Sequence, residues 1–150
     1  MPSDLVDRTG WRLFNLFTKA HVVAYKATGG RVGRKFFKGA PVCLVDHVGR
    51  KSGQQRTTPL IYIRDDDAVV LVASKGGYPS HPAWWINLRA NPETYVQIDS
   101  ERRPVRAREA TDEERERLWP RLTEVWPAYD DYQAKTERRI PVVILEPRSP

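Results

Sequence analysis

The run PVCLVDHVGRKSGQQRTTPLIYIRDDDAVVLVAS, residues 41–74, decides the fold because it carries three successive strand signals. Its segments 41–48, 56–64 and 68–74 are rich in valine, isoleucine, leucine and threonine, which suit a pleated and half-buried surface. Three aspartates at 65–67 join the second segment to the third and predict a tight hairpin. The run therefore predicts consecutive strands of an antiparallel sheet.

The rest of the chain continues in short elements without regular alternation of strands and helices. Further strands are expected at 94–98, 104–108 and 141–145, and helices at 82–91, 111–125 and 129–136. Thr111 and Glu114 form a capping box that begins the second of these helices, and Pro120 is expected to kink it. Short strands joined by hairpins predict an antiparallel, mainly β barrel or sandwich of the α+β class with peripheral helices.

Residues 1–30 predict one amphipathic helix in front of a core that spans residues 40–150 of a single domain. The helix would begin at a Ser3 cap and stop at Gly29-Gly30. Its apolar face would hold Leu5, Leu13, Phe14, Phe17, His21 and Tyr25. Its basic side chains are Arg8, Arg12, Lys19 and Lys26. They suit peripheral contact with anionic lipid, and docking on the protein's own domain is the simpler alternative.

Composition indicates one globular domain with an anionic partner. The 150 residues are 40% hydrophobic and 29% charged, as is usual for a single folded unit. The net charge of +6 suits nucleic acid, an anionic membrane surface, or a phosphorylated or carboxylated ligand, and charge alone does not choose among them. The chain has no secretory signal and no apolar run near the ~18 residues of a spanning helix, so we expect a cytoplasmic protein, with membrane association left open.

The cysteine and the histidines argue against a metal site. Cys43 is the only cysteine, which excludes an internal disulfide and a paired-cysteine metal site and indicates a reducing compartment. We expect it to be inert core. His21, His47 and His81 lack mutual metal-ligand spacing, so each is expected at the surface or at a helix end, and no metal is expected.

The loop GRKSGQQR, residues 49–56, lies between the first two predicted strands and is the most informative motif. Its two glycines permit a tight turn in which backbone N–H groups can converge on an anion. The side chains that could bind the anion are Arg50, Lys51, Ser52 and Arg56. The loop matches neither a Walker loop nor a dinucleotide fingerprint. An ordinary basic hairpin turn is the commoner explanation for such a loop on its own.

A second element, ASKGG at residues 73–77, follows the third predicted strand. Its glycines allow close approach to a ligand, Ser74 offers a hydroxyl and Lys75 a cation. We expect hairpin pairing to bring this glycine segment beside the basic loop. The next motif, HPAWWINL, places Trp84 and Trp85 on different sides of a helix, so one is expected to pack inward and the other to line a pocket for a planar ring.

Together these motifs resemble the signature of the deazaflavin-dependent nitroreductases of actinobacteria: GRK(S/T)G, RxxPL, ASKGG, PxW(Y/W)xNL and ANP. The chain carries them in this order at 49–53, 56–60, 73–77, 82–88 and 90–92. The resemblance covers essentially the whole chain beyond the N-terminal helix. Such an ordered series is far more specific than any one of its motifs.

The resemblance implies a split β-barrel related to FMN-binding folds, and coenzyme F420 as cofactor. This 8-hydroxy-5-deazaflavin carries a phospholactyl-oligoglutamate tail, which would be the anionic partner. By matching position, the tail would be held by Arg50, Lys51, Ser52 and Arg56. The ring and ribityl chain would be lined by Thr57, Thr58, Pro59, Leu60, Ile61, Val72, Ala73, Ser74, Lys75, Ala83, Trp84, Trp85, Ile86 and Asn87.

The implied chemistry is hydride transfer from the reduced deazaflavin to quinone-like, nitroaromatic or other conjugated, electron-poor small molecules. Tyr129 matches a family substrate-site tyrosine and would orient or protonate the substrate, with Ser74 as hydrogen-bond partner and Trp126 and Tyr132 as walls. Packing of a C-terminal helix explains the three aromatic residues equally well. The sequence departs from its relatives at Trp126, where a tyrosine is usual, and at residues 46–48, where threonines are usual.

Two alternative functions remain open at this stage. One is an FMN-dependent oxidoreductase on the same barrel, and the other is a non-enzymatic basic module that binds membrane surfaces. Binding of nucleic acid is not expected, because no recognised motif is present and the basic residues cluster with glycine and tryptophan rather than on a reading helix. The oligomeric state is left open.

Overall fold

The computed structural model describes residues 18–33, 35 and 39–149. A helix covers residues 18–28 and is followed by a turn at Gly29-Gly30, as predicted. The predicted Ser3 cap and the other members of this helix up to Phe17 lie outside the described residues.

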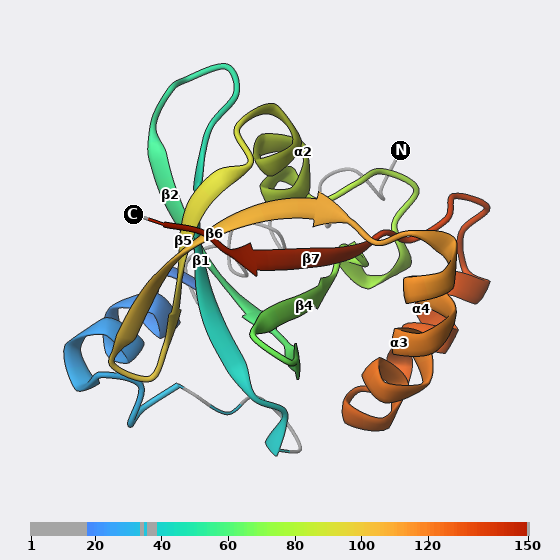
Figure 1. Ribbon diagram of the computed structural model, residues 1–150, viewed down its shortest axis with the longest axis horizontal. Coiled ribbons are helices and arrows are strands. Elements are labelled where there is room, and N and C mark those ends of the chain that lie inside the picture. The colour runs from blue at the N-terminus through green and yellow to red at the C-terminus, as the bar shows by residue number, and fades with distance from the viewer. Residues whose placement is uncertain (1–17, 34, 36–38, 150) are drawn as a thin grey trace, which may run out of the picture.

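The described strands form one seven-stranded sheet in which neighbouring strands run antiparallel, in the order β2-β1-β5-β6-β7-β4-β3 (Figure 1). The strands are β1 (Val42–Val48), β2 (Gln55–Ile61), β3 (Ile63–Asp65), β4 (Ala68–Val72), β5 (Glu93–Ile98), β6 (Glu101–Glu109) and β7 (Val142–Pro147). The predicted strand 56–64 is interrupted at Tyr62, which separates β2 from β3. The other strands lie where they were predicted, and the expected antiparallel, mainly β fold is confirmed.

The sheet is strongly curved, because its two edge strands are consecutive in the chain. β2 and β3 are at opposite ends of the strand order, yet only Tyr62 lies between them. The backbone N–H of Tyr62 donates to the carbonyl oxygen of Pro41 at 3.2 Å, which holds this corner against the start of β1. The two edges therefore meet at one point, as in a split barrel. The predicted hairpin at 65–67 is present between β3 and β4, but its expected continuation along β2 is wrong, since the other neighbour of β4 is β7.

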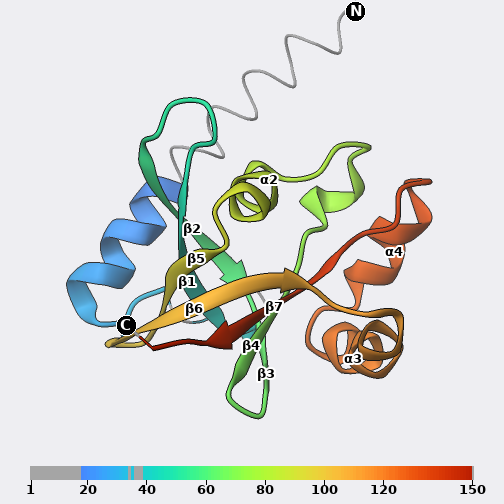
Figure 2. The ribbon, with the colours of Figure 1, turned by 45° about the horizontal axis from the view of Figure 1, so that its top comes forward.

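Helices pack against both faces of the curved sheet (Figure 2). They are α2 (Ala83–Ala90), α3 (Asp112–Val125) and α4 (Ala128–Ala134), with a 3-10 turn, η2, at Lys75–Gly77. The predicted capping box of α3 is present: Glu114 N–H donates to Thr111 Oγ1 at 3.2 Å, and Thr111 N–H donates to Glu114 Oε1 at 2.9 Å. α3 continues through Pro120 to Val125.

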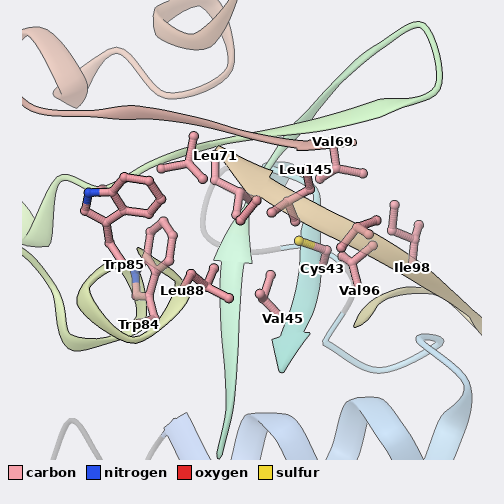
Figure 3. Close-up of a cluster of buried hydrophobic side chains, with 14 residues drawn as sticks. Cys43, Val45, Val69, Leu71, Trp84, Trp85, Leu88, Val96, Ile98 and Leu145 are labelled. Carbon is pink, nitrogen blue, oxygen red and sulfur yellow. The ribbon is translucent and has the colours of Figure 1, made fainter. Parts of the chain in front are cut away.

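Two hydrophobic clusters occupy the two faces of the sheet. Side chains of the first, between the sheet and α2, include Cys43, Val45, Leu71, Trp84, Trp85 and Leu88 (Figure 3). Side chains of the second, beneath α3 and α4, include Val70, Val72, Leu118, Leu122 and Tyr129. Alternate residues of β4 thus enter different clusters, which explains why its sequence is apolar throughout. The expected core position of Cys43 is confirmed, and burial raises the pKa of its thiol.

The helix at 18–28 packs against its own domain. Val22 and Tyr25 form a third cluster with Leu44 of β1. Tyr25 is completely buried, and its hydroxyl accepts a hydrogen bond from the backbone N–H of Asp99 at 2.7 Å. Burial raises the pKa of Tyr25 to about 12. These contacts agree with the docking alternative for the described part of the helix. In the portion of the chain that the structure describes, no helix is long and apolar enough to cross a membrane.

Candidate functional site

The basic loop is the exposed connection between β1 and β2, with Val48 paired to Gln55 at its base. Its turn is closed by backbone hydrogen bonds from Gly49 N–H to Gln54 O at 2.9 Å and from Gly53 N–H to Gly49 O at 2.8 Å. Gly53 has a φ of +69°, which favours glycine. The side chains of Arg50, Lys51 and Arg56 are exposed, so this surface offers positive charge to solvent. Ser52 Oγ accepts from Gln54 N–H at 3.2 Å, which leaves its hydroxyl proton able to donate, and its contact with a ligand stays a prediction.

A buried polar network fixes the base of this loop. The backbone N–H of Arg50 donates to Asn87 Oδ1 at 3.1 Å, and Asn87 Nδ2 lies 2.9 Å from His47 Nδ1. His47 Nε2 lies 2.8 Å from Thr58 Oγ1. The side chain of His47 is only 4% exposed, so its expected position at the surface is wrong. Burial, with Arg56 second, lowers the pKa of His47 to about 4, which keeps the ring neutral at pH 7.

The opposite face of β1 carries a second polar group, centred on Asp46. Its carboxylate accepts from Thr57 Oγ1 at 2.7 Å and from the Arg102 guanidinium at 2.9 Å. Thr57 Oγ1 in turn accepts from Lys26 of the N-terminal helix at 3.4 Å. Thr57 therefore faces that helix, whereas Thr58 faces α2. Strand alternation thus divides the predicted lining residues Thr57, Thr58, Pro59, Leu60 and Ile61 between two faces, with Leu60 on the α2 side.

The glycine segment contacts α4, not the basic loop. Gly77 has a φ of +84°, and a Cβ there would lie 2.7 Å from the carbonyl oxygen of Tyr132. This glycine therefore serves close packing of α4 and not the approach of a ligand. Gly76, with a φ of +62° and nothing within 4 Å of a Cβ, faces open space. In the ribbon, α2 lies between the β1–β2 loop and the glycine segment (Figure 2).

Arg138 holds the glycine segment in place. The sequence did not predict this role. Its guanidinium donates to Ser74 O at 2.7 Å, to Ala73 O at 3.3 Å and to Tyr78 O at 2.8 Å. It also lies 3.2 Å from His81 Nδ1, which must accept because arginine only donates. Burial, with the Arg138 charge second, lowers the pKa of His81. No local motif marks this role, because the contacts join residues 57 to 65 positions apart.

Both tryptophans of α2 are buried in the first cluster, and the expected role of one of them as the wall of a pocket for a planar ring stays a prediction. Trp84 and Trp85 are 6% and 3% exposed, with ring centroids 6.4 Å apart. The indole N–H of Trp85 is buried and has no hydrogen-bond partner among the described residues. An orphaned buried donor is costly, and an oxygen of a bound group would satisfy it. The more exposed side chains of α2 near the site are Ala83 and Ile86.

The C-terminal aromatic residues lie on the second cluster. Tyr129 is 4% exposed, its ring centroid is 6.2 Å from that of Tyr132, and burial raises the pKa of its hydroxyl. Trp126 and Tyr132 are half-buried, with Trp126 Nε1 3.4 Å from the Tyr132 hydroxyl. The packing explanation accounts for the position of Tyr129, and its contact with substrate stays a prediction. The described residues contain no group of histidine, cysteine and acidic side chains suited to a metal ion.

The seven-stranded antiparallel sheet whose edges meet at Tyr62 gives the protein the split-barrel, FMN-binding-like fold. An FAD-binding protein from Mesorhizobium loti shares the fold at 19% identity and a TM-score of 0.51, covering 72% of this chain and 81% of its own. At this identity the likeness concerns the fold alone. Two solved structures are nearer in sequence. A domain-swapped dimer is 36% identical with a TM-score of 0.68, covering 97% of this chain and 100% of its own. An F420-H2 dependent reductase is 44% identical with a TM-score of 0.65, covering 71% of this chain and 94% of its own.

Sequence comparison then identifies the family. The profile of the F420H(2)-dependent quinone reductase family matches residues 17–147. A candidate F420H(2)-dependent quinone reductase of Mycobacterium tuberculosis is 48% identical, over 79% of this chain and 99% of its own. An F420H(2)-dependent quinone reductase of the same species is 40% identical, over 87% of this chain and 89% of its own. The chain belongs to the F420H(2)-dependent quinone reductase family, which confirms the expected F420-dependent oxidoreductase with coenzyme F420 as its cofactor.

Proposed function

We propose that the protein reduces quinones with reduced coenzyme F420 bound between the basic loop and α2. The observation that carries this proposal is the exposed cationic loop tied to α2 by the hydrogen bond from Arg50 N–H to Asn87. A rigidly held loop loses less conformational entropy when it binds an anion than a free one. An anionic tail is the kind of partner that such a loop selects.

The loop's cationic side chains would bind the phosphate and glutamates of the tail. Arg50, Lys51 and Arg56 are exposed around one turn and would supply charge-assisted hydrogen bonds. The hydroxyl oxygen of Ser52 accepts from Gln54 N–H, which supports the shape of the loop, and its O–H would donate to the tail. Binding through these groups should weaken with salt, because exposed charges are screened.

The ring and ribityl chain would lie between β2, the end of β4 and α2. On this side of β2, Thr58 and Leu60 supply a hydroxyl and an apolar surface. On α2, Ala83 and Ile86 are the more exposed of the predicted contacts, and Trp85 offers its unpartnered N–H. Val72 and Ala73 are buried and would support the site from behind, while Ser74 and Lys75 are half-buried beside it.

When bound, the reduced deazaflavin supplies a hydride equivalent, and quinone reduction to the quinol needs a proton as well. The protein's part is to orient the two reactants and to exclude water. We assign the substrate side to Trp126, Tyr129 and Tyr132, with Ser74 as a hydrogen-bond partner. Tyr132 is the more exposed of the two tyrosines, and a phenol hydroxyl can donate a hydrogen bond or a proton. Nitroaromatic compounds are a second, similarly electron-poor substrate class.

Anoxic kinetics with reduced F420 and menadione test the activity. We expect menadione-dependent oxidation of F420H2, followed by absorbance, and saturable binding of F420 by the purified protein. Failure to bind F420 would overturn the proposal. Isolation of a yellow protein that retains FMN and ignores F420 would favour the FMN-dependent alternative.

Comparison of Tyr132→Phe with Tyr129→Phe tests the substrate side. We expect the first to lower kcat by about tenfold or more with little change in F420 affinity, as for loss of a proton donor. The second should have the smaller effect on kcat, because its hydroxyl is buried. Unchanged kcat in both variants would exclude a tyrosine donor.

A further inference from the structure

A directional chain of hydrogen bonds runs from β2 into the basic loop through His47 and Asn87. Asn87 Oδ1 accepts from the backbone N–H of Arg50 at 3.1 Å, which sets the orientation of the amide. Its NH2 group therefore points at His47 Nδ1, 2.9 Å away. A donor there requires an acceptor, so Nδ1 of His47 carries no proton.

The second ring nitrogen of His47 must then carry the proton. Nε2–H donates to Thr58 Oγ1 at 2.8 Å, so each donor of the chain meets an acceptor. Only the neutral imidazole protonated on Nε2 allows all three hydrogen bonds to form. A proton on Nδ1 would place two donors, Nδ1–H and the NH2 of Asn87, against each other. If the Asn87 amide were rotated, its NH2 would instead face the donor N–H of Arg50.

Burial makes this arrangement costly to disturb. His47 and Asn87 are 4% and 6% exposed, so neither can exchange a lost partner for bulk water. The charged groups near the ring are Asp46 on β1 and Arg56 on β2, and Arg56 opposes protonation while Asp46 favours it. α2 contributes the neutral amide of Asn87. The loop is thus connected at Arg50 to Asn87 of α2 and, through His47, to Thr58 of β2.

We propose that His47 and Asn87 are positioning residues for recognition of the cofactor's anionic tail. They fix the backbone at Arg50 in the conformation that presents the cationic side chains of the basic loop. Neither residue needs to touch the reacting atoms. This inference rests on the proposed function, because it concerns how the same loop binds F420.

Two substitutions of His47 separate the two ends of the imidazole. In His47→Asn, the side-chain oxygen takes the place of Nδ1 and can accept from Asn87, although the bond to Thr58 is lost. In His47→Gln, the side-chain nitrogen takes the place of Nε2 and can donate to Thr58, although the acceptor for Asn87 is lost. His21→Gln is the matched control, since His21 contacts Gly33 O in another part of the chain.

The measurement is equilibrium binding of F420 and of the tail-less deazaflavin, which lacks the phosphate and glutamates. We expect His47→Gln to weaken F420 binding by about tenfold, as for loss of a buried hydrogen bond, and to leave the tail-less deazaflavin unaffected. The affinity of His47→Asn for both ligands should stay within about threefold of that of the unmodified protein, since the hydrogen bond from Asn87 remains. His21→Gln should change neither affinity.

Nitrogen-15 NMR of the wild-type imidazole gives a readout that does not depend on the variants. We expect His47 as the Nε2–H tautomer at pH 7. A proton on Nδ1, equal losses for both ligands in His47→Gln, or a larger loss in His47→Asn than in His47→Gln would overturn the inference. If the unmodified protein binds no F420, the proposed function fails instead, and the NMR signal still tests the hydrogen-bond chain.

Discussion

Arg138 donates a hydrogen bond of 2.7 Å to the carbonyl oxygen of Ser74, 64 positions earlier in the chain. The same guanidinium reaches Ala73 and Tyr78, so one side chain from the segment after α4 determines the path of the glycine segment. Arginine suits this position because its rigid fork supplies several donors at once. The conformation of residues 73–78 therefore depends on the C-terminal part of the chain.

Replacement of Arg138 by lysine should destabilise the protein although the charge is kept. A single ammonium cannot reach all three carbonyl groups, and we expect a loss of about 1–3 kcal/mol in the free energy of unfolding, measured with urea. Arg139→Lys is the control. Its ion pair with Asp112 is exposed, with side chains 60% and 86% accessible, so the expected change is under about 0.5 kcal/mol. Equal effects would contradict the role of Arg138.

Two adjacent glycines should respond differently to alanine. Gly77→Ala places a Cβ 2.7 Å from the carbonyl oxygen of Tyr132 at a φ of +84°, so α4 must shift. Gly76→Ala meets nothing within 4 Å and carries only the strain of a φ of +62°. We expect about 1 kcal/mol of destabilisation at Gly76 and at least about twice that at Gly77. Thermal unfolding measures the stability of both variants. If Gly76→Ala were less stable than Gly77→Ala, the packing of Gly77 against α4 would not explain the difference.

The pair formed by Arg108 and Glu114 should make stability depend on acid pH. Two hydrogen bonds of 2.7 Å from Arg108, assisted by the capping bond from Thr111 N–H, lower the pKa of Glu114 to about 2 from 4.5. Because the folded pKa is the lower one, this contribution is present above pH 4.5 and is lost as the pH falls towards 2.

We therefore expect the free energy of unfolding of the unmodified protein to fall more steeply than that of Glu114→Gln over this range. The difference should reach a few kcal/mol, on the order of 2, after allowance for partial exposure of the carboxylate. Urea titrations at several pH values measure it. Parallel curves for the two proteins would show that Glu114 does not titrate as the geometry requires.

The cationic side chains of the basic loop should govern F420 affinity. We expect Arg50→Ala combined with Lys51→Ala to weaken binding by about tenfold or more and to reduce its dependence on salt, since two charge-assisted contacts are removed. Arg106→Ala is the control, because its exposed ion pair with Glu93 lies on the β5–β6 hairpin. A double variant that binds F420 with unchanged affinity would place the tail elsewhere.

Local features of the fold were predictable because each is encoded within a few neighbouring residues. The capping box needs only Thr111 and Glu114, and the β3–β4 turn needs only the aspartates at 65–67. The ordered motifs between 49 and 92 likewise identified the family before any contact was known. Their spacing along the chain is a property of the sequence alone.

Burial and partners were decided only by the tertiary structure. His47 was expected at the surface because no neighbouring residue in the sequence predicts its partner. That partner is Asn87, which is 40 positions later in the chain and contacts the imidazole ring in the folded protein. The burial of Tyr129 and of both tryptophans of α2 was likewise decided by packing on the barrel, which determines which face of each helix is covered.

The sequence by itself thus determined the strands, the turns, the cap of α3 and the cofactor family. Those features follow from backbone propensity and from residue order. The curvature of the sheet decided the rest: β2 and β3 meet at Tyr62, β4 pairs with β3 and β7 and not with β2, and α2 lies between the two loops. Contacts across such distances in sequence depend on how whole elements pack, which no short segment specifies.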